Sequence, residues 1–237
     1  MLSMMDDEEL TIIAHEIGHG FGLPDFYTDS DKPSTDFPAT IMEAGRSMTV
    51  TEGDGWMLRR VLEHLKSRNS TSGSAPFGDI TAGSDKCVVG NPNEYITSAD
   101  LEWIWDNRIG PNAKQSDSNW NVMDNKNWIM DHIVKNQGTI NYCIRWDSTQ
   151  KLSKSVASKF QAMLTRQFNA WNRWLVGYNC WPYDEIKVNV VGWAVKDSSL
   201  LDWSDDSLGK IYEGELDAEG IPMCPQNCYR FYDAGIN

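Results

Sequence analysis

Two histidines and two carboxylates near the start of the chain have a spacing that suits a metal ion. His15, Glu16 and His19 form the pattern H-E-x-x-H, which continues through Gly22 to Asp25. Residues four apart share one face of a helix, so His15 and His19 can offer imidazole nitrogens to one ion. Gly22 lets the chain turn sharply after such a helix and bring Asp25 round as a third ligand.

These ligands predict a catalytic zinc site. Two histidines and one carboxylate leave the fourth position of a tetrahedral Zn²⁺ open to water, whereas structural zinc sites are closed. Glu16 falls on the flank of the same helical face, where its carboxylate can hold and deprotonate a metal-activated water. We therefore expect His15, His19 and Asp25 to bind Zn²⁺ and Glu16 to act as general base. A core helix with two surface histidines is the simpler alternative, and the eleven-residue pattern argues against it.

The flanking sequence predicts the helix that this chemistry requires, over residues 6–20. Asp6 and Glu9 form a capping box at its start. Gly18 inside a helix costs roughly 1 kcal/mol relative to alanine, which we interpret as a close approach of the backbone to metal and substrate. An apolar stripe would anchor the helix to a core: Leu10, Ile13, Ala14 and Ile17.

Residues 15–27 (HEIGHGFGLPDFY) and 41–45 (IMEAG) resemble secreted metzincin-type zinc peptidases of filamentous fungi and actinobacteria. The aspartate third ligand is similar to that of the snapalysins, which are small bacterial neutral proteases. Metzincins place a methionine in a tight turn beneath the three ligands. The resemblance implies that Met42 is this structural Met-turn residue.

The resemblance continues in the second half of the chain, but in reversed order. The segments that look like the amino-terminal half of the same family are 138–146 (GTINYCIRW), 181–184 (WPYD), 191–195 (VGWAV) and 201–205 (LDWSD). Two explanations fit this order. The chain is a permuted catalytic domain, or it spans the end of one tandem copy and the start of the next.

The expected fold class is α+β and zincin- or metzincin-like, with a mixed β-sheet backed by a long helix, an active-site helix and a Met-turn. We expect residues 1–68 to form the zinc-helix and Met-turn half of the catalytic domain. Residues 69–100 read as a Ser/Gly/Pro-rich connector. Residues 101–237 form the strand-helix-strand half, and the two halves are expected to share a core.

Hydrophobic periodicity predicts four elements in these halves. A closing amphipathic helix covers residues 54–68, and a longer helix covers 153–177. Alternating apolar residues predict a strand at 140–146 and a second at 186–195. The alternation in the second strand changes phase near Gly192, which indicates a β-bulge there.

The composition is typical of a secreted protein. The 237 residues carry a formal net charge of -13, which argues against nucleic acid and anionic membranes as partners. No apolar run approaches the ~20 residues that cross a bilayer. No secretory signal precedes the zinc helix, so we expect an extracellular location from the family and the cysteines.

Five cysteines leave at least one thiol unpaired. Disulfides are expected among Cys143, Cys180, Cys224 and Cys228, while Cys87 lies in the connector. A structural zinc site on Cys224 and Cys228 is the alternative, but it lacks a second pair at suitable spacing.

Two functions are consistent with these features. The first is a secreted, monomeric zinc endopeptidase that hydrolyses protein or peptide substrates. The second is a proteolytically weak metal-binding module associated with glycans or cell walls, or an inactive fragment of a tandem peptidase. Most tryptophans are expected in the core, while Trp103 and Trp105 stay candidates for carbohydrate contact. The intact ligands favour the peptidase, because a binding module has no use for Glu16.

Overall fold

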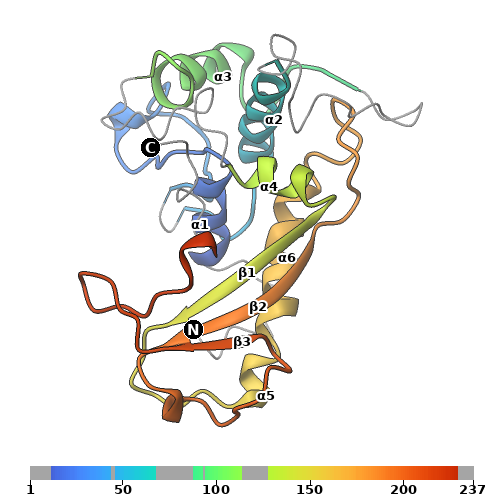
Figure 1. Cartoon of the computed structure of the whole chain (residues 1–237). Coiled ribbons are helices and arrows are strands. Elements are labelled where there is room, and N and C mark those ends of the chain that lie inside the picture. Colours follow the sequence, from blue (N-terminus) through green and yellow to red (C-terminus); the bar gives the residue numbers. More distant parts are fainter. Residues whose placement is uncertain (1–11, 44–45, 68–87, 93, 114–127, 229–237) are drawn as a thin grey trace. The chain divides into compact units, whose positions relative to one another are not determined.

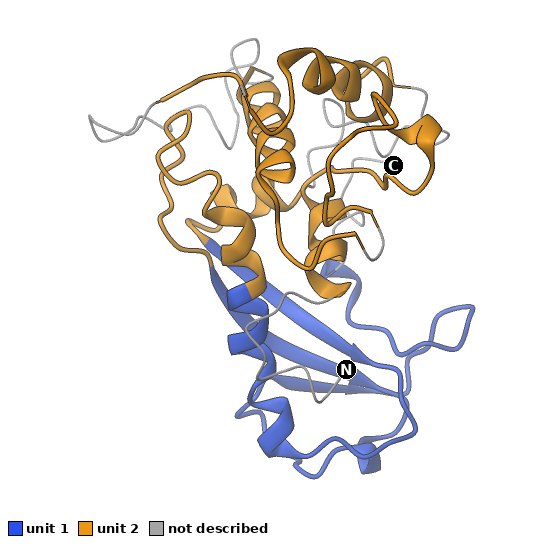
Figure 2. Ribbon diagram, turned by 180° about the vertical axis from the view of Figure 1, so that it is seen from behind, with its two compact units in different colours: residues 1–7, 139–166, 187–237 blue, residues 8–138, 167–186 orange. Residues whose placement is uncertain are grey.

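The computed structural model is an α+β protein with a three-stranded parallel sheet and several helices (Figure 1). It describes residues 12–43, 46–67, 88–92, 94–113 and 128–228. The chain forms two compact units, and each gathers segments that are far apart in sequence (Figure 2). Unit 1 comprises residues 1–7, 139–166 and 187–237, and unit 2 comprises residues 8–138 and 167–186.

Unit 2 is mainly helical. Its elements are α1 (Ile12–Gly20), a short 3-10 helix η2 (Asp29–Asp31), α2 (Glu52–Ser67), α3 (Ser98–Ile104), a π-helical turn η4 (Trp105–Ile109) and α4 (Ile129–Lys135). The predicted helix over 54–68 is α2, and α1 contains the described part of the helix predicted over 6–20. The capping box of that helix, and residues 69–87 and 93 of the connector, lie outside the described residues.

Unit 1 contains the sheet, in the order β1 (Thr139–Trp146), β2 (Lys187–Val195) and β3 (Lys210–Glu213). Both strand pairs are parallel, so the expected mixed sheet is corrected to a parallel one in the described chain. The connection from β1 to β2 passes through helices, and a crossover of this kind returns the chain in the same direction. The described part of unit 1 also contains the short 3-10 helices η6 (Ser198–Leu200) and η7 (Gln226–Cys228).

The predicted bulge in β2 is confirmed. Tyr142 pairs with Val190, but the next residue, Cys143, pairs with Gly192. Val191 is therefore the extra residue, and the register shifts where the hydrophobic alternation changes phase.

The long helix predicted over residues 153–177 is divided. Ser153 caps the short helix α5 (Lys154–Ala157) by accepting a hydrogen bond from the amide of Val156. After a turn, α6 (Phe160–Asn172) continues, with its residues up to 166 in unit 1 and the rest in unit 2. In unit 1, Phe160 packs edge-on against Trp193, with ring centroids 5.2 Å apart. Trp193 is fully buried, as expected for a core tryptophan.

One disulfide joins Cys143 on β1 to Cys224 within unit 1. Cys180 is also disulfide-bonded. The expectation for Cys228 is wrong, because this residue is an exposed free thiol in η7. Pairing of Cys224 with Cys143 also removes the alternative of a structural zinc site on Cys224 and Cys228.

The core of unit 2 joins α1 to the second half of α6. The indole Nε1 of Trp171 donates a hydrogen bond to the carbonyl of Ala14 at 2.9 Å. The ring of Phe21 lies 5.9 Å from that of Trp171 and 6.4 Å from that of Phe168. The helix that carries the histidines thus shares a core with residues about 150 positions further along the chain.

Gly18 has a steric role in this core. A Cβ atom there would lie under 3.0 Å from both the sulfur of Met42 and Cζ2 of Trp171. Met42 and Trp171 are both fully buried. The sequence interpretation is corrected here: the backbone at Gly18 comes close to packed side chains of the core. It was expected to come close to a metal ion and a substrate.

We expect the Gly18→Ala variant to be less stable by about 1–2 kcal/mol. Overpacking a core costs about 1–3 kcal/mol, and two contacts under 3.0 Å to buried side chains place this variant in the upper half of that range, about 2–3 kcal/mol. The better helix propensity of alanine returns about 1 kcal/mol. Urea unfolding of the metal-free protein measures the difference. Gly90→Ala is the control, because the nearest atom to a Cβ at Gly90 is 3.8 Å away. Equal stability of Gly18→Ala and wild type would contradict the steric role.

Candidate metal centre

The end of α1 places Asp25, the candidate third ligand. Gly22 has a φ of 92°, the left-handed conformation that glycine adopts at little cost. The amide of Gly22 donates to the carbonyl of His19 at 2.9 Å, and the amide of Leu23 donates to that of Gly18 at 3.1 Å. These bonds close the helix and turn the chain back towards its own histidines. The turn predicted at Gly22 is confirmed.

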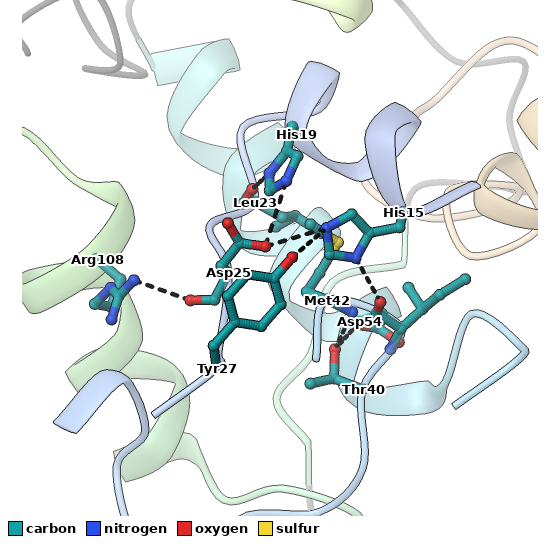
Figure 3. Close-up of polar contacts among 10 residues, drawn as sticks. His15, His19, Leu23, Asp25, Tyr27, Thr40, Met42, Asp54 and Arg108 are labelled. Carbon is teal, nitrogen blue, oxygen red and sulfur yellow. Dashed lines mark hydrogen bonds and ion pairs between the residues drawn. The ribbon is translucent and has the colours of Figure 1, made fainter. Parts of the chain in front are cut away.

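His15, His19 and Asp25 lie together in unit 2 and form a group that could hold a metal ion (Figure 3). One ligand atom from each residue lies within 4.8 Å of the other two. Asp25 Oδ1 is 3.1 Å from Nε2 of His15 and 3.4 Å from Nε2 of His19. Ligand atoms of a tetrahedral zinc, with bonds of about 2.0–2.2 Å, are roughly 3.3–3.6 Å apart. The two separations from Asp25 Oδ1 therefore suit a small cation between these atoms.

The hydrogen bonds of the two imidazoles direct their lone pairs to the same point. His15 Nδ1 lies 2.8 Å from the carbonyl oxygen of Ile41, and His19 Nδ1 lies 2.9 Å from that of Leu23. Because a carbonyl oxygen only accepts, each Nδ1 carries the proton of the neutral ring. Each Nε2 then presents a lone pair towards Asp25. Outer hydrogen bonds of this kind fix the tautomer of metal-binding histidines.

Asp25 Oδ1 is buried and receives no hydrogen bond. A buried carboxylate oxygen without a donor is unfavourable, and here it also faces two nitrogen lone pairs. A cation bound by the three atoms would relieve both costs. The residues present therefore fit a metal ion.

Met42 belongs to a turn that is bonded to the segment carrying Asp25. The turn at Thr40 is closed by a hydrogen bond from the amide of Glu43 to the carbonyl of Thr40, at 3.2 Å. The carbonyl of Met42 accepts from the amide of Phe26 at 3.0 Å, which ties this turn to the segment that carries Asp25. The Met42 side chain is fully buried against Gly18.

Glu16 lies on the exposed side of α1, one residue from His15. No polar contact competes for its carboxylate among the interactions of the described residues, so it is accessible to a water or substrate. This placement suits the general base that the sequence predicts.

Tyr27 belongs to the site, although the sequence analysis assigned it no role. Its hydroxyl is 3.3 Å from Nε2 of His15, and its ring lies parallel to that of His15 (Figure 3). Burial, a hydrogen bond to Asp25 and the charges of Asp25 and Glu16 raise the pKa of the Tyr27 phenol. The hydroxyl therefore keeps its proton at neutral pH and can donate it in a hydrogen bond. The available signal was its position two residues after the third ligand.

Arg108 holds the backbone of Asp25, the candidate third ligand. It comes from η4, and its Nη2 donates to the carbonyl oxygen of Asp25 at 2.9 Å. A second guanidinium nitrogen pairs with Asp31, and the guanidinium lies over the ring of Phe26. The π-helical geometry of η4 is of the kind that often occurs at functional sites. Sequence reasoning missed Arg108 because it lies 83 residues from Asp25.

Comparison with known proteins identified no relative of this chain. No family model, no curated protein and no solved structure matches this chain. Among the helices of the described residues, none has the length and apolar character to cross a membrane. The function is therefore inferred from the residues of the site and their geometry.

Proposed function

We propose that the protein is a secreted zinc endopeptidase of the metzincin type. The observation that carries this proposal is the convergence of two histidine Nε2 atoms and the buried Oδ1 of Asp25, with an exposed glutamate, Glu16, next to His15 on α1. Nitrogen and carboxylate ligands with an open fourth position are the donor set of catalytic zinc sites. Zinc also prefers tetrahedral coordination, which the two distances from Asp25 Oδ1 to the histidine nitrogens suit.

Separate residues would bind the metal ion and transfer the proton during peptide hydrolysis. His15, His19 and Asp25 would hold the ion. When bound, Zn²⁺ would polarise the scissile carbonyl and lower the pKa of the attacking water. Glu16 would accept a proton from that water and pass it to the amine nitrogen as the peptide bond breaks.

Tyr27 would support the charge that develops on the substrate. Its hydroxyl lies next to the metal-binding nitrogen of His15 and keeps its proton, so it can donate a hydrogen bond to a developing oxyanion. With 54% of the residue exposed, the ring also borders the position that a substrate would take.

The proposal includes the location of the enzyme, its substrate class and its oligomeric state. The Cys143–Cys224 disulfide is compatible with an oxidising, extracellular environment. The substrate would be a protein or peptide, and the enzyme would act as a monomer. The net charge of -13 disfavours nucleic acid and anionic membranes as partners.

Of the two tryptophans considered for carbohydrate contact, Trp105 is unsuited to that role. Trp105 is 9% exposed and stacks on His64, with ring centroids 3.5 Å apart. A sugar platform needs an open aromatic face, and this ring has none. Trp105 is accordingly a core residue of the α2–η4 contact.

We expect removal of zinc to abolish the cleavage of unfolded casein by the full chain, and one equivalent of Zn²⁺ to restore it. The chelator 1,10-phenanthroline removes the metal, and casein cleavage is followed by release of soluble peptides. Mg²⁺ is the control ion, because it prefers oxygen ligands in octahedral geometry and should not restore activity. Cleavage that survives complete zinc removal, or its absence in the zinc-loaded protein, would refute the proposal.

A further inference from the structure

A buried carboxylate lies behind the metal centre, and the proposed reaction does not use it. Asp54 belongs to the first turn of α2 and is fully buried. Its Oδ2 accepts hydrogen bonds from the amide of Ile41 at 3.1 Å and from the amide and hydroxyl of Thr51 at 2.8 and 2.7 Å. Its Oδ1 accepts from the hydroxyl of Thr40. Desolvation raises the pKa of this carboxyl, which shows that its burial is costly and calls for a role.

Half of these bonds cap α2. Thr51 and Asp54 form a reciprocal pair, in which the amide of Asp54 donates to the hydroxyl of Thr51 at 3.3 Å. A pair of this kind satisfies the free amides at a helix start. The bonds from Thr40 and Ile41 contribute nothing to the cap, since both residues belong to the turn that carries Met42.

The remaining bonds form a continuous chain from Asp54 to His15. The Thr40 hydroxyl donates to Asp54 and accepts from the amide of Met42 at 3.1 Å. That amide belongs to the same peptide group as the carbonyl of Ile41, which accepts from Nδ1 of His15. Figure 3 shows the chain from Asp54 through Thr40 and the turn to the imidazole. Each bond in such a series polarises the next and strengthens it.

We propose that Asp54 is a positioning residue for the metal centre, which acts through Thr40 and the Ile41–Met42 peptide to hold His15 in its Nδ1–H tautomer. This role rests on the proposed zinc site. It differs from the direct carboxylate–histidine contact of many zinc proteins, because a hydroxyl and a peptide group stand between them. The Nδ1 of His19 bonds instead to the carbonyl oxygen of Leu23, three residues after the end of α1.

Two variants test the chain of hydrogen bonds. Asp54→Asn keeps the shape of the side chain and removes its charge. Thr40→Val removes the linking hydroxyl and leaves Asp54 and the helix cap in place. We expect each to weaken Zn²⁺ binding of the full chain by about 10–100-fold, the usual effect of losing an outer hydrogen-bond partner of a metal ligand. Competition with a chelator of known affinity measures the loss.

Thr51→Ala is the matched control. It weakens the cap of α2 but leaves the path from Asp54 to His15 intact. We expect a lower midpoint of thermal unfolding and a Zn²⁺ affinity within twofold of wild type. An equal loss of affinity in Thr51→Ala would show that the other variants act through general destabilisation, and it would overturn the proposal.

A second readout needs no metal. Nitrogen NMR of the metal-free chain at pH 8, above the usual histidine pKa of about 6.5, reports the tautomer of each imidazole. We expect Asp54→Asn and Thr40→Val to lower the Nδ1–H population of His15 and to leave that of His19 unchanged. Unchanged tautomers with zinc affinity within twofold of wild type in both variants would overturn the proposal. If the wild type binds no zinc, the zinc enzyme proposal fails, and the tautomers still decide the role of Asp54.

Discussion

The Glu16→Gln variant should keep its zinc and lose about 10²–10⁴-fold in peptidase activity, the usual contribution of a general base. Glutamine has nearly the same shape as glutamate, so the change removes the proton acceptor and leaves His15, His19 and Asp25 in place. Glu16 is exposed, and its replacement should therefore have little effect on the free energy of unfolding. The measurement is kcat/KM on a peptide substrate, with zinc content determined on the same sample.

Glu102→Gln is the control for this variant, because Glu102 is an exposed glutamate on α3. It makes the same chemical change away from the metal centre and should retain full activity. Casein cleavage by Glu16→Gln at the wild-type rate would show that the activity arises elsewhere. Loss of zinc together with activity would assign Glu16 to metal binding instead of proton transfer.

The His15→Ala variant should lose its stoichiometric zinc. We expect about one Zn²⁺ per chain in the wild type and almost none in the variant after dialysis against a weak chelator, because two protein ligands remain where catalytic zinc uses three. The His15 imidazole is held by the carbonyl of Ile41 at Nδ1 and directs its Nε2 to Asp25. Elemental analysis of the purified proteins gives the metal content.

His64→Ala is the matched control for zinc content. His64 stacks on Trp105 in the contact between α2 and η4, and burial lowers the pKa of its imidazole. Its removal takes one histidine from the chain and should leave one Zn²⁺ bound. Stoichiometric zinc in His15→Ala would mean that the metal site lies elsewhere, and the enzyme assignment would then lose its basis.

Much of the candidate site could be predicted from the sequence because its geometry is local. The spacing of four between His15 and His19 puts both rings on one face of α1, whatever surrounds that helix. The turn at Gly22 follows from the left-handed conformation that this residue adopts. The bulge in β2 could be predicted for a similar reason. A change in the alternation of apolar residues along a strand shows where an extra residue shifts the register.

Other predictions failed where distant segments decide the outcome. Strand direction depends on the path of the connections between strands, so the parallel sheet could not be read from the alternation of apolar residues. The break between α5 and α6 interrupts an apolar pattern that looks continuous. Pairing of cysteines depends on which segments meet in space, and this left Cys228 as a free thiol.

The sequence by itself determined the candidate ligands His15, His19 and Asp25 and the general base expected at Glu16, because these lie within eleven consecutive residues whose backbone fixes their spacing. Only the tertiary structure brought the supporting groups to them. Arg108 reaches Asp25 from 83 residues away, and Trp171 reaches α1 from 157. The physical reason is the range of the interactions. Helix periodicity and turn conformation act over a few residues, whereas a buried hydrogen bond forms wherever packing places its donor and acceptor.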